Sequence, residues 1–279
     1  MRRMTDGNRD VPYALGSSAA EHDRLIRQAA CLEPYTERFL REAGIGLGMR
    51  VLDLGSGVGD VSMLAARLVG SEGEVVGIER DEPAAARARA RAAQAGLPNV
   101  SFIQSDVSRI ESERPSDAVV GRFILMFVEN PAAVLRSVSR LVRPGGIVAF
   151  LEPSYRPFLL LSAHLPLWSR SVSLVDEALR RSGANTEMGI ALYRIFQESG
   201  LPAPAMRLEI PLGNDADFIA WPADTLLSLR PQIERLNLSL EGLGDLETLA
   251  ARLQSEIAQA SAVVPWQGLV GAWCRLPSL

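Results

Sequence analysis

Val51-Leu52-Asp53-Leu54-Gly55-Ser56-Gly57-Val58-Gly59-Asp60 (VLDLGSGVGD, residues 51–60) is the stretch that decides the fold of this chain. An apolar run ends in three glycines spaced two apart, and a helix-like pattern follows. Glycine lets backbone N–H groups approach a ligand that a Cβ atom would hold off. The N-terminus of the following helix favours negative charge. The stretch therefore indicates a nucleotide-type cofactor site at the end of a first parallel strand.

The spacing of the glycines separates this turn from a dinucleotide-binding turn, which requires G-x-G-x-x-G. Gly59 comes one residue early, and Asp60 stands where that pattern needs glycine. An acid at this point would repel a pyrophosphate. Asp53, just before the glycines, can pair with a cationic group such as an α-ammonium. The stretch favours a cofactor with an amino-acid end and no phosphates, and a plain strand–helix turn is the alternative.

Two later strand ends carry acids. Glu79 closes the run 74–79, about 20 residues past the glycines, where an acidic side chain would take ribose hydroxyls. Asp106 closes the run 99–106 and could accept from an exocyclic adenine amine. The alternatives are a solvated carboxylate for Glu79 and a helix N-cap, for Val107 onward, for Asp106.

Apolar runs and helical patterns alternate through the middle of the chain, which predicts an α/β fold with a parallel sheet and helices on both faces. Asn130-Pro131 opens the last of these helices and Pro144-Gly145-Gly146 stops it. The predicted strands are 50–54, 74–79, 100–104, 117–121, 146–151, 206–210 and 268–275, and the predicted helices are 19–43, 60–69, 83–95 and 131–142.

The chain resembles the class I S-adenosylmethionine-dependent methyltransferases. The resemblance covers about residues 48–153 and is looser outside that span. It rests on DLGSGVG (53–59), GIERD (77–81), QSD (104–106), DAVVGRFILMF (117–127) and LVRPGGIVAFLEP (141–153). The segment YALGSSAAEHDRLIRQA (13–29) is similar to the entry region of the ubiquinone/menaquinone-biosynthesis-like small-molecule methyltransferases. The resemblance implies a Rossmann-like sheet whose last strand is antiparallel and inserts beside the fifth.

The resemblance also implies which residues bind S-adenosylmethionine. Those expected along its methionine part are Gly55, Ser56, Gly57 and Gly59, with Arg122 facing its end and Gln28 and Arg24 reaching its carboxylate. Those expected at the nucleoside are Glu79 for the ribose, Arg80 against the adenine face, and Asp106 with Val107 at the adenine edge.

Three segments lie outside the sheet, and we expect them to cap the cofactor and build an apolar pocket for a small-molecule substrate. The expected organisation is an entry segment at 1–46, a cofactor-binding core at 47–153, a helical substrate cap at 154–192, a core helix and strand at 193–212, a helical insertion at 213–264, and a final core strand at 265–279.

Methyl transfer from a sulfonium needs little acid–base machinery, because the cofactor carries the difficult chemistry. If the acceptor is a hydroxyl, His164 is the candidate base, and packing or surface exposure is its alternative. Glu152 could bind a polar group of the substrate. Tyr155 and Tyr193 could position the acceptor, although such rings often simply pack. His22, in the entry helix, is expected to face solvent or cap the helix.

Composition limits the partners. The 279 residues carry a net charge of −4, which argues against nucleic-acid binding. Arg87 and Arg91 share a helix face that is expected to be solvated. Cys31 and Cys274 offer neither metal spacing nor a disulfide framework, so no metal is expected. Without a signal-peptide pattern or an apolar run long enough to span a bilayer, we expect a cytoplasmic protein, with the N-terminal helix as a candidate homodimer surface.

These observations predict a methyltransferase that acts on an oxygen, carbon or nitrogen of a small, largely apolar molecule, such as a specialised metabolite. One alternative is a cofactor-binding protein of the same fold with a non-methylating or regulatory role. A nicotinamide-dependent oxidoreductase is a second alternative, which the early Gly59, Asp60 and the Pro-Gly-Gly turn disfavour.

Overall fold

The centre of the molecule is a seven-stranded sheet in the order β3-β2-β1-β4-β5-β9-β6. The computed structural model describes residues 15–16, 18–107, 110 and 114–278. β9 runs antiparallel to both β5 and β6, and the other pairings are parallel. This confirms the predicted fold class. The strands are β1 (Arg50–Leu54), β2 (Glu74–Glu79), β3 (Val100–Gln104), β4 (Ser116–Arg122), β5 (Val142–Ser154), β6 (Ala205–Glu209) and β9 (Gly268–Arg275).

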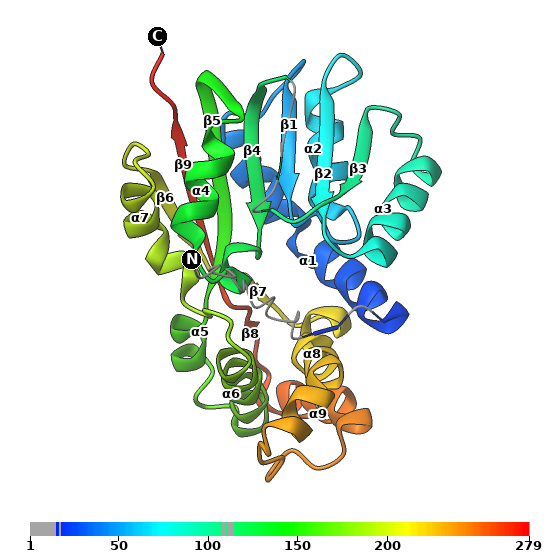
Figure 1. Ribbon diagram of the computed structural model, residues 1–279. Helices are drawn as coiled ribbons and strands as arrows, with labels where there is room; N and C mark the ends of the chain where they lie inside the picture. Colours follow the sequence, from blue (N-terminus) through cyan, green and yellow to red (C-terminus); the bar gives the residue numbers. More distant parts are fainter. Residues whose placement is uncertain (1–14, 17, 108–109, 111–113, 279) are drawn as a thin grey trace, which may run out of the picture.

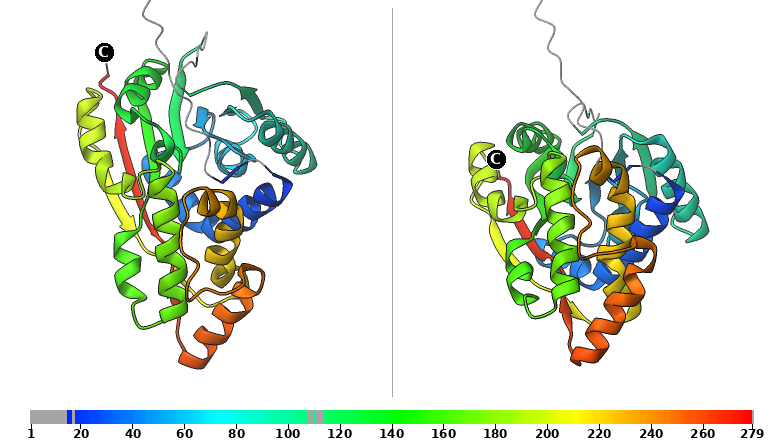
Figure 2. Two further views of the ribbon diagram at one scale, coloured as in Figure 1. Left: turned by 60° about the horizontal axis from the view of Figure 1, so that its bottom comes forward. Right: turned by 90° about the horizontal axis from the view of Figure 1, so that it is seen from below.

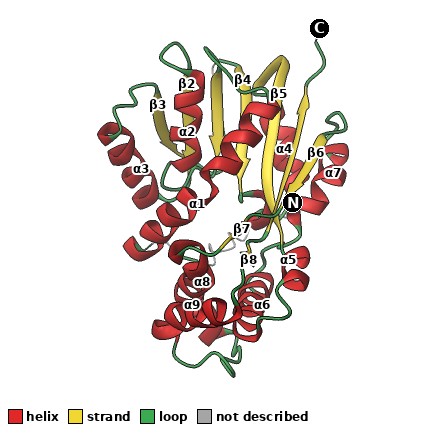
Figure 3. Cartoon of the chain, turned by 180° about the vertical axis from the view of Figure 1, so that it is seen from behind, coloured by secondary structure: helices red, strands yellow, loops and turns green. Residues whose placement is uncertain are grey.

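Helices cover both faces of this sheet, as Figures 1 and 3 show. The elements α1 (Ala19–Ala43) and α2 (Asp60–Val69) pack on one face, and α4 (Pro131–Ser139) and α7 (Met188–Glu198) on the other. Beside α2, α3 (Glu82–Gln94) buries Ala88 against Met63 and Phe102. Because both faces are covered, the central strands are continuous apolar runs, which is why they could be recognised in the sequence.

The predicted end of the fourth helix is wrong. α4 ends at Ser139 instead of residue 142, because Val142 already pairs with Ser116 as the first residue of β5. The backbone N–H of Ser116 donates to the carbonyl of Leu141 at 2.7 Å. Sheet pairing therefore overrides the helical pattern, and the Pro-Gly-Gly segment lies inside a long, irregular β5.

A helical cap lies beyond the carboxyl ends of the parallel strands, as Figures 1 and 2 show. A short antiparallel pair, β7 (Leu212–Gly213) with β8 (Val264–Pro265), leads into and out of its second part, residues 216–260. Its helices are α5 (Arg156–Leu161), α6 (Pro166–Arg181), α8 (Ala216–Arg235) and α9 (Leu249–Ala260), with the short 3₁₀ helix η2 (Leu246–Thr248) before α9. The helix α7 belongs to the sheet layer and begins at Met188, so the expected boundary at residue 193 lies inside it.

An aromatic cluster forms the core of the cap. The ring of Trp221 stacks on Trp266 with centroids 5.0 Å apart and lies edge-on to Trp168 at 6.2 Å. Phe158 packs on Trp221 at 6.0 Å, and Phe218 on Trp266 at 5.1 Å. Aromatic rings bury large areas and fix one another's orientation, so this cluster holds α5, α6 and α8 together.

Two carboxylates attach the cap helices to neighbouring elements. Glu256 of α9 accepts from the backbone N–H groups of Leu167 and Trp168 at 2.8 and 2.9 Å, at the start of α6. Glu187 accepts from the N–H groups of Tyr155 and Arg156 at 2.9 and 2.8 Å, at the start of α5. Each carboxylate satisfies amides that a helix N-terminus leaves without partners.

Candidate active site

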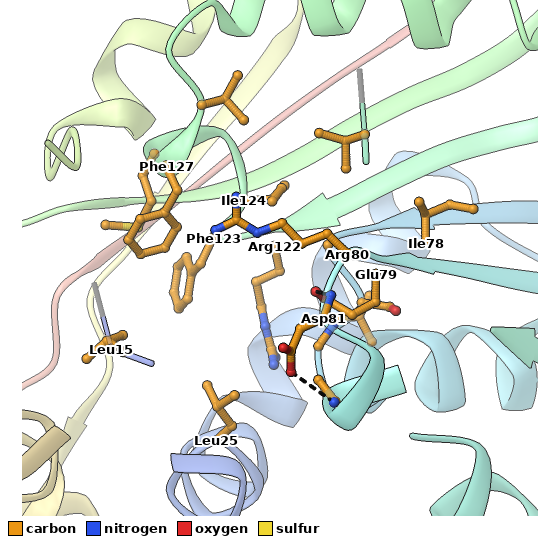
Figure 4. A pocket seen from close by; sticks show the side chains of 18 of the residues that line it. Leu15, Leu25, Ile78, Glu79, Arg80, Asp81, Arg122, Phe123, Ile124 and Phe127 are labelled. Carbon is orange, nitrogen blue, oxygen red and sulfur yellow. Dashed lines mark hydrogen bonds between the residues drawn. The ribbon is translucent and has the colours of Figure 1, made fainter. Parts of the chain in front are cut away.

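A cavity of about 1130 Å³ lies where the carboxyl ends of the parallel strands meet the cap. The glycine turn, the ends of β2 and β4, the start of α1 and the cap all contribute to its lining. In Figure 4, Phe123 and Phe127 lie on one side of this pocket, and Glu79 and Asp81 lie on the other. The cap, the entry helix and the sheet edge therefore meet around one cavity, as expected for a ligand site of an α/β fold.

The three glycines of the turn have different functions. All three have positive φ, at +66° for Gly55, +54° for Gly57 and +90° for Gly59. A Cβ on Gly57 would meet nothing within 4 Å, so this glycine leaves open space on the pocket side. A Cβ on Gly59 would lie 2.9 Å from Cζ of Phe102 and 3.0 Å from Cβ of Ala88. Gly55, Ser56 and Gly57 line the pocket, whereas Gly59 lets α2 pack on the core. Gly59, unlike the other residues expected along the methionine part, is not among the described residues that line the cavity.

Glu79 lies at the pocket, at the end of β2. Its Oε2 accepts from the backbone N–H of Gly57 at 2.8 Å, and its Oε1 accepts from the N–H of Asp81 at 2.9 Å. The carboxylate is half-buried and joins the glycine turn to the second strand. It keeps free lone pairs, because a carboxylate can accept about four hydrogen bonds.

Asp53 does not reach the pocket, which corrects the expected pairing with an α-ammonium. It points from β1 toward α2, where the hydroxyl of Ser62 donates to its Oδ2 at 2.6 Å. Only 1% of Asp53 is exposed, and it is not among the described residues that line the cavity. Burial raises the pKa of Asp53 to about 7, against the hydrogen bond from Ser62, which lowers it.

Arg122 lines the pocket at the end of β4. Its Nη1 donates to Oγ1 of Thr36 on α1 at 2.9 Å, which ties the entry helix to the sheet edge. Burial lowers the pKa of Arg122, and Asp60 and Asp53 oppose that effect.

The residue after Arg122 has a strained backbone. Phe123 has φ +56°, and its side chain also faces the pocket. A bulky residue in the left-handed region is uncommon, and such strain gathers at functional sites. Sequence patterns do not carry this signal.

Five further residues expected at the cofactor line the pocket: Arg24, Gln28, Arg80, Asp106 and Val107. Gln28 accepts a hydrogen bond from Nη1 of Arg24 at 2.6 Å. Arg24 also forms a buried, two-pronged ion pair with Glu21, with both N–O distances at 2.7 Å. The charge of Arg24 is therefore balanced inside the entry helix.

His22 was expected to face solvent or to cap the entry helix, and the structure places it in the pocket lining instead. It is 7% exposed, and its Nε2 has no hydrogen-bond partner within the described part of the chain. Oδ2 of Asp81 lies 3.9 Å from that nitrogen. The sequence did hold a signal, because His22 continues the apolar spacing of Leu25, Ala29 and Leu32 along one helix face.

In the arginine-rich stretch of α3, Arg87 is exposed, whereas Arg91 is less solvated than expected. Arg91 forms an ion pair with Asp60 at 2.7 Å and donates to the carbonyl of Val58 at 2.5 Å. It therefore neutralises the acid that follows the glycine turn. The pair explains how Asp60 can lie at the N-terminus of α2 beside other pocket acids.

Of the four residues proposed for the chemistry of the acceptor, the structure brings only Tyr155 to the cavity. His164 is exposed in the loop between α5 and α6, and Tyr193 is exposed on α7. Neither is among the described lining residues, so both assignments are corrected.

Glu152 is fully buried inside β5, where it accepts from the N–H groups of Ile124, Leu125 and Met126 at 3.0, 2.8 and 3.2 Å. This corrects its expected contact with substrate. The prediction ended the strand at residue 151, whereas β5 continues to Ser154. Glu152 is therefore an anchor for the chain that follows β4, and burial raises its pKa to about 8.

Charge is distributed unevenly around the cavity. Among the described lining residues, every Asp, Glu and Arg lies before residue 130, on the entry helix, at the start of α2, at the strand ends and in the loop before α4. The cap side contributes only uncharged side chains: Tyr155, Leu179, Trp221, Thr225 and Gln267. A charged, polar ligand fits the side formed by the strand ends and the glycine turn, and a neutral ligand fits the cap side.

The charged side of the cavity, around the glycine turn, fits S-adenosylmethionine, the cofactor that the resemblance implies. The buried Oγ of Ser56 lines the cavity and has no partner within the described chain. The open space at Gly57 and the spare lone pairs of Glu79 lie in the same turn region.

Among the described residues, no group of three or more His, Cys, Asp and Glu is arranged to hold a metal ion. No described helix is long and apolar enough to cross a membrane.

Comparison with known proteins agrees with this arrangement. The family model described as "Methyltransferase domain" matches residues 45–200. The ubiquinone/menaquinone biosynthesis C-methyltransferase UbiE of Coxiella burnetii is 31% identical over 219 residues, which are 77% of this chain and 85% of that protein. The aklanonic acid methyltransferase DauC of Streptomyces sp. strain C5 is 30% identical over 207 residues, 69% of this chain and 91% of that protein.

Solved structures agree on the fold. The cyclase SpnF superposes with a TM-score of 0.52 at 18% identity, over 88% of this chain and 82% of that one. At this identity the similarity shows the shared fold alone. Because SpnF is named a cyclase, the fold by itself does not fix the reaction.

Proposed function

The chain belongs to the methyltransferase-domain family, and from this premise we propose that it transfers the methyl group of S-adenosylmethionine to a small, largely apolar acceptor. The observation that carries the proposal is the uneven charge around a single large cavity. Charged groups surround the glycine turn, and uncharged side chains of the cap face the other part. Such a cavity holds a polar cofactor beside a neutral acceptor.

We assign the residues that hold the cofactor from the lining. Ser56 and Gly57 would contact its methionine part, Glu79 its ribose, and Arg80 and Asp106 its adenine. When bound, S-adenosylmethionine supplies an electrophilic methyl group on a sulfonium. The acceptor atom would use its own electron pair to bond the methyl carbon and would release its proton to solvent, while sulfur would keep the pair of the broken carbon–sulfur bond.

The work of the chain is to align acceptor and methyl group and to exclude water, as proximity and desolvation require. Tyr155 is the lining side chain best placed to orient the acceptor, because it lies directly after β5 and its ring is held edge-on to Phe158 at 5.3 Å. The relative UbiE is named a C-methyltransferase, so a carbon acceptor is the first to test, before oxygen and nitrogen.

The experiment is a turnover assay with S-adenosylmethionine and a panel of neutral ring compounds with activated carbon or hydroxyl positions. Mass spectrometry follows both S-adenosylhomocysteine and a product heavier by one methylene unit. Formation of both in equal amounts supports methyl transfer.

The main alternative is a protein of this fold that binds the cofactor without methylating. It predicts cofactor binding and conversion of an acceptor without S-adenosylhomocysteine. The similarity to the cyclase SpnF makes this alternative concrete.

A homodimer and a cytoplasmic location stay predictions from the sequence. Light scattering after size-exclusion chromatography tests whether the protein is a homodimer.

A further inference from the structure

Three buried polar groups on the cap side of the cavity have no hydrogen-bond partner among the residues that the structure describes. Nε1 of Trp221, Oγ1 of Thr225 and Oε1 of Gln267 make no hydrogen bond within the described part of the chain. Each of the three residues is 4% exposed, and each lines the cavity. A buried polar group without a partner costs roughly 1–3 kcal/mol, so such groups call for an explanation.

The three residues converge from two elements. Trp221 and Thr225 are four residues apart on α8 and therefore share one face of that helix. Gln267 directly follows Trp266, whose ring stacks on Trp221 with centroids 5.0 Å apart. The backbone N–H of Trp266 donates to the carbonyl of Pro211 at 2.8 Å, and Gly268 pairs with Ser154 in the sheet. Gln267 is thus held from both sides.

The packing of the aromatic cluster also fixes the Trp221 ring. It contacts Trp266, Trp168 and Phe158 at centroid distances of 5.0, 6.2 and 6.0 Å. A side chain locked by its neighbours loses little conformational entropy when it binds a ligand. The indole N–H is therefore a preorganised donor.

We propose that Trp221, Thr225 and Gln267 form a subsite that binds a neutral oxygen-bearing group, a carbonyl or a hydroxyl, at the far end of the acceptor. The proposal rests on the proposed function, because it names the chemistry of that acceptor. The indole N–H donates, the threonine hydroxyl donates or accepts, and the glutamine amide does both. A carbonyl or hydroxyl oxygen satisfies this set.

Charge makes the subsite selective. The described lining residues of the cap include no Lys, Arg, Asp or Glu, so a carboxylate, phosphate or ammonium placed there would lose its hydration without gaining a counter-ion. Arg24, on the entry helix, already pairs with Glu21 and Gln28. The cap therefore selects neutral oxygen-bearing acceptors over ionised ones of the same shape.

The test measures binding to the whole protein saturated with S-adenosylhomocysteine. The probes share one ring system: 2-naphthol, methyl 2-naphthyl ketone and naphthalene-2-carboxylate. Calorimetry is run on the wild type, on the double variant T225V/Q267M, and on Q259M as the matched control. Gln259 is exposed on α9 and is not among the described lining residues.

We expect the wild type and Q259M to bind 2-naphthol and the ketone at least tenfold more tightly than the carboxylate. T225V/Q267M should weaken the two neutral probes about tenfold, the combined effect of two modest hydrogen bonds, and leave affinity for S-adenosylhomocysteine unchanged. Thermal unfolding checks that the variant is folded.

The proposal is overturned if the carboxylate binds as tightly as the neutral probes, if the double variant binds all probes like the wild type, or if the wild type binds no neutral probe. These outcomes leave the proposed function standing as long as S-adenosylhomocysteine binds. Loss of S-adenosylhomocysteine binding by the wild type would instead count against the proposed function itself.

Discussion

Glu79 is the single side chain on which cofactor binding should depend most. It links the glycine turn to β2 through the N–H groups of Gly57 and Asp81, and it faces the cavity. We expect E79A to weaken S-adenosylhomocysteine binding by about 1–3 kcal/mol, the range for a lost hydrogen bond to a charged group. Titration calorimetry measures the change.

The matched control for E79A is E82A. Glu82 is an exposed acid three residues later that pairs with Arg89 at 2.7 Å and is not among the described lining residues. It should leave affinity within error of the wild type. Equal affinities of E79A and the wild type would remove Glu79 from the site.

Asp53 makes the stability of the fold depend on pH. Its ordinary pKa of 3.8 rises to about 7 because it is buried, so the folded state favours the neutral acid. The stability that the protonated Asp53 contributes is fully present below the pKa of the unfolded chain, 3.8. It is lost as the pH rises through the pKa of the folded state, about 7. Relative to D53N, which keeps an acceptor for Ser62 but cannot ionise, the wild type should lose up to about 3 kcal/mol between pH 5 and pH 8.

Urea denaturation of the wild type and D53N at each pH gives this difference. Parallel stability curves for the two proteins between pH 5 and pH 8 would show that the folded state does not raise the pKa of Asp53, and would contradict this account.

At the scale of the element, the glycine turn combines a ligand surface with a packing contact. Alanine at either Gly57 or Gly59 must adopt positive φ, which costs roughly 1–2 kcal/mol. G57A places its Cβ in open space, so it should weaken S-adenosylhomocysteine binding at least tenfold with little further loss of stability. G59A meets Phe102 and Ala88, and should destabilise the fold by a further 1–3 kcal/mol, about the cost of overpacking.

Paired measurements of binding and unfolding separate these two roles. If G59A is as stable as G57A, then α2 can shift to make room and the packing assignment is wrong. If G57A binds normally, then the turn does not face the cofactor.

The capping carboxylates are the devices that attach the cap. Glu256 reaches from α9 to two amides at the start of α6. Removing it in E256A should lower the free energy of unfolding by about 1–2 kcal/mol, as for the loss of a helix cap. Chemical denaturation measures the loss.

E177A is the matched control for E256A, because Glu177 forms an exposed pair with Arg181 one turn away on α6. Such surface pairs contribute at most about 0.5 kcal/mol. An E256A protein as stable as E177A would show that α9 is held by apolar packing alone.

For the whole molecule, the sequence predicted the sheet and its strand positions, because buried parallel strands are apolar runs. The glycine turn is a local signal, and most of the residues expected to bind the cofactor line the cavity. Predictions failed where tertiary contacts decide. Glu152 looked like a strand-end acid, yet β5 extends past it and buries it. His164 follows the fifth strand in sequence, but the packing of α5 against α6 leaves it in an exposed loop.

Other parts of the site had no local signal at all. Trp221 and Thr225 of α8 meet Gln267, which directly precedes β9, only through the packing of the folded chain. The two segments are far apart in the sequence, so no local pattern predicts their convergence. The left-handed backbone of Phe123 likewise arises from the meeting of β4, β5 and the pocket, and an aromatic residue does not predict it.

The measurement that tests the central claim most directly is calorimetric titration of the purified wild-type chain with S-adenosylhomocysteine, with NAD as the parallel ligand. The charge distribution of the cavity and the early third glycine predict micromolar binding of S-adenosylhomocysteine and no binding of NAD. Folded protein, free of carried-over ligand, that binds NAD or neither compound would contradict the assignment of the cavity to S-adenosylmethionine.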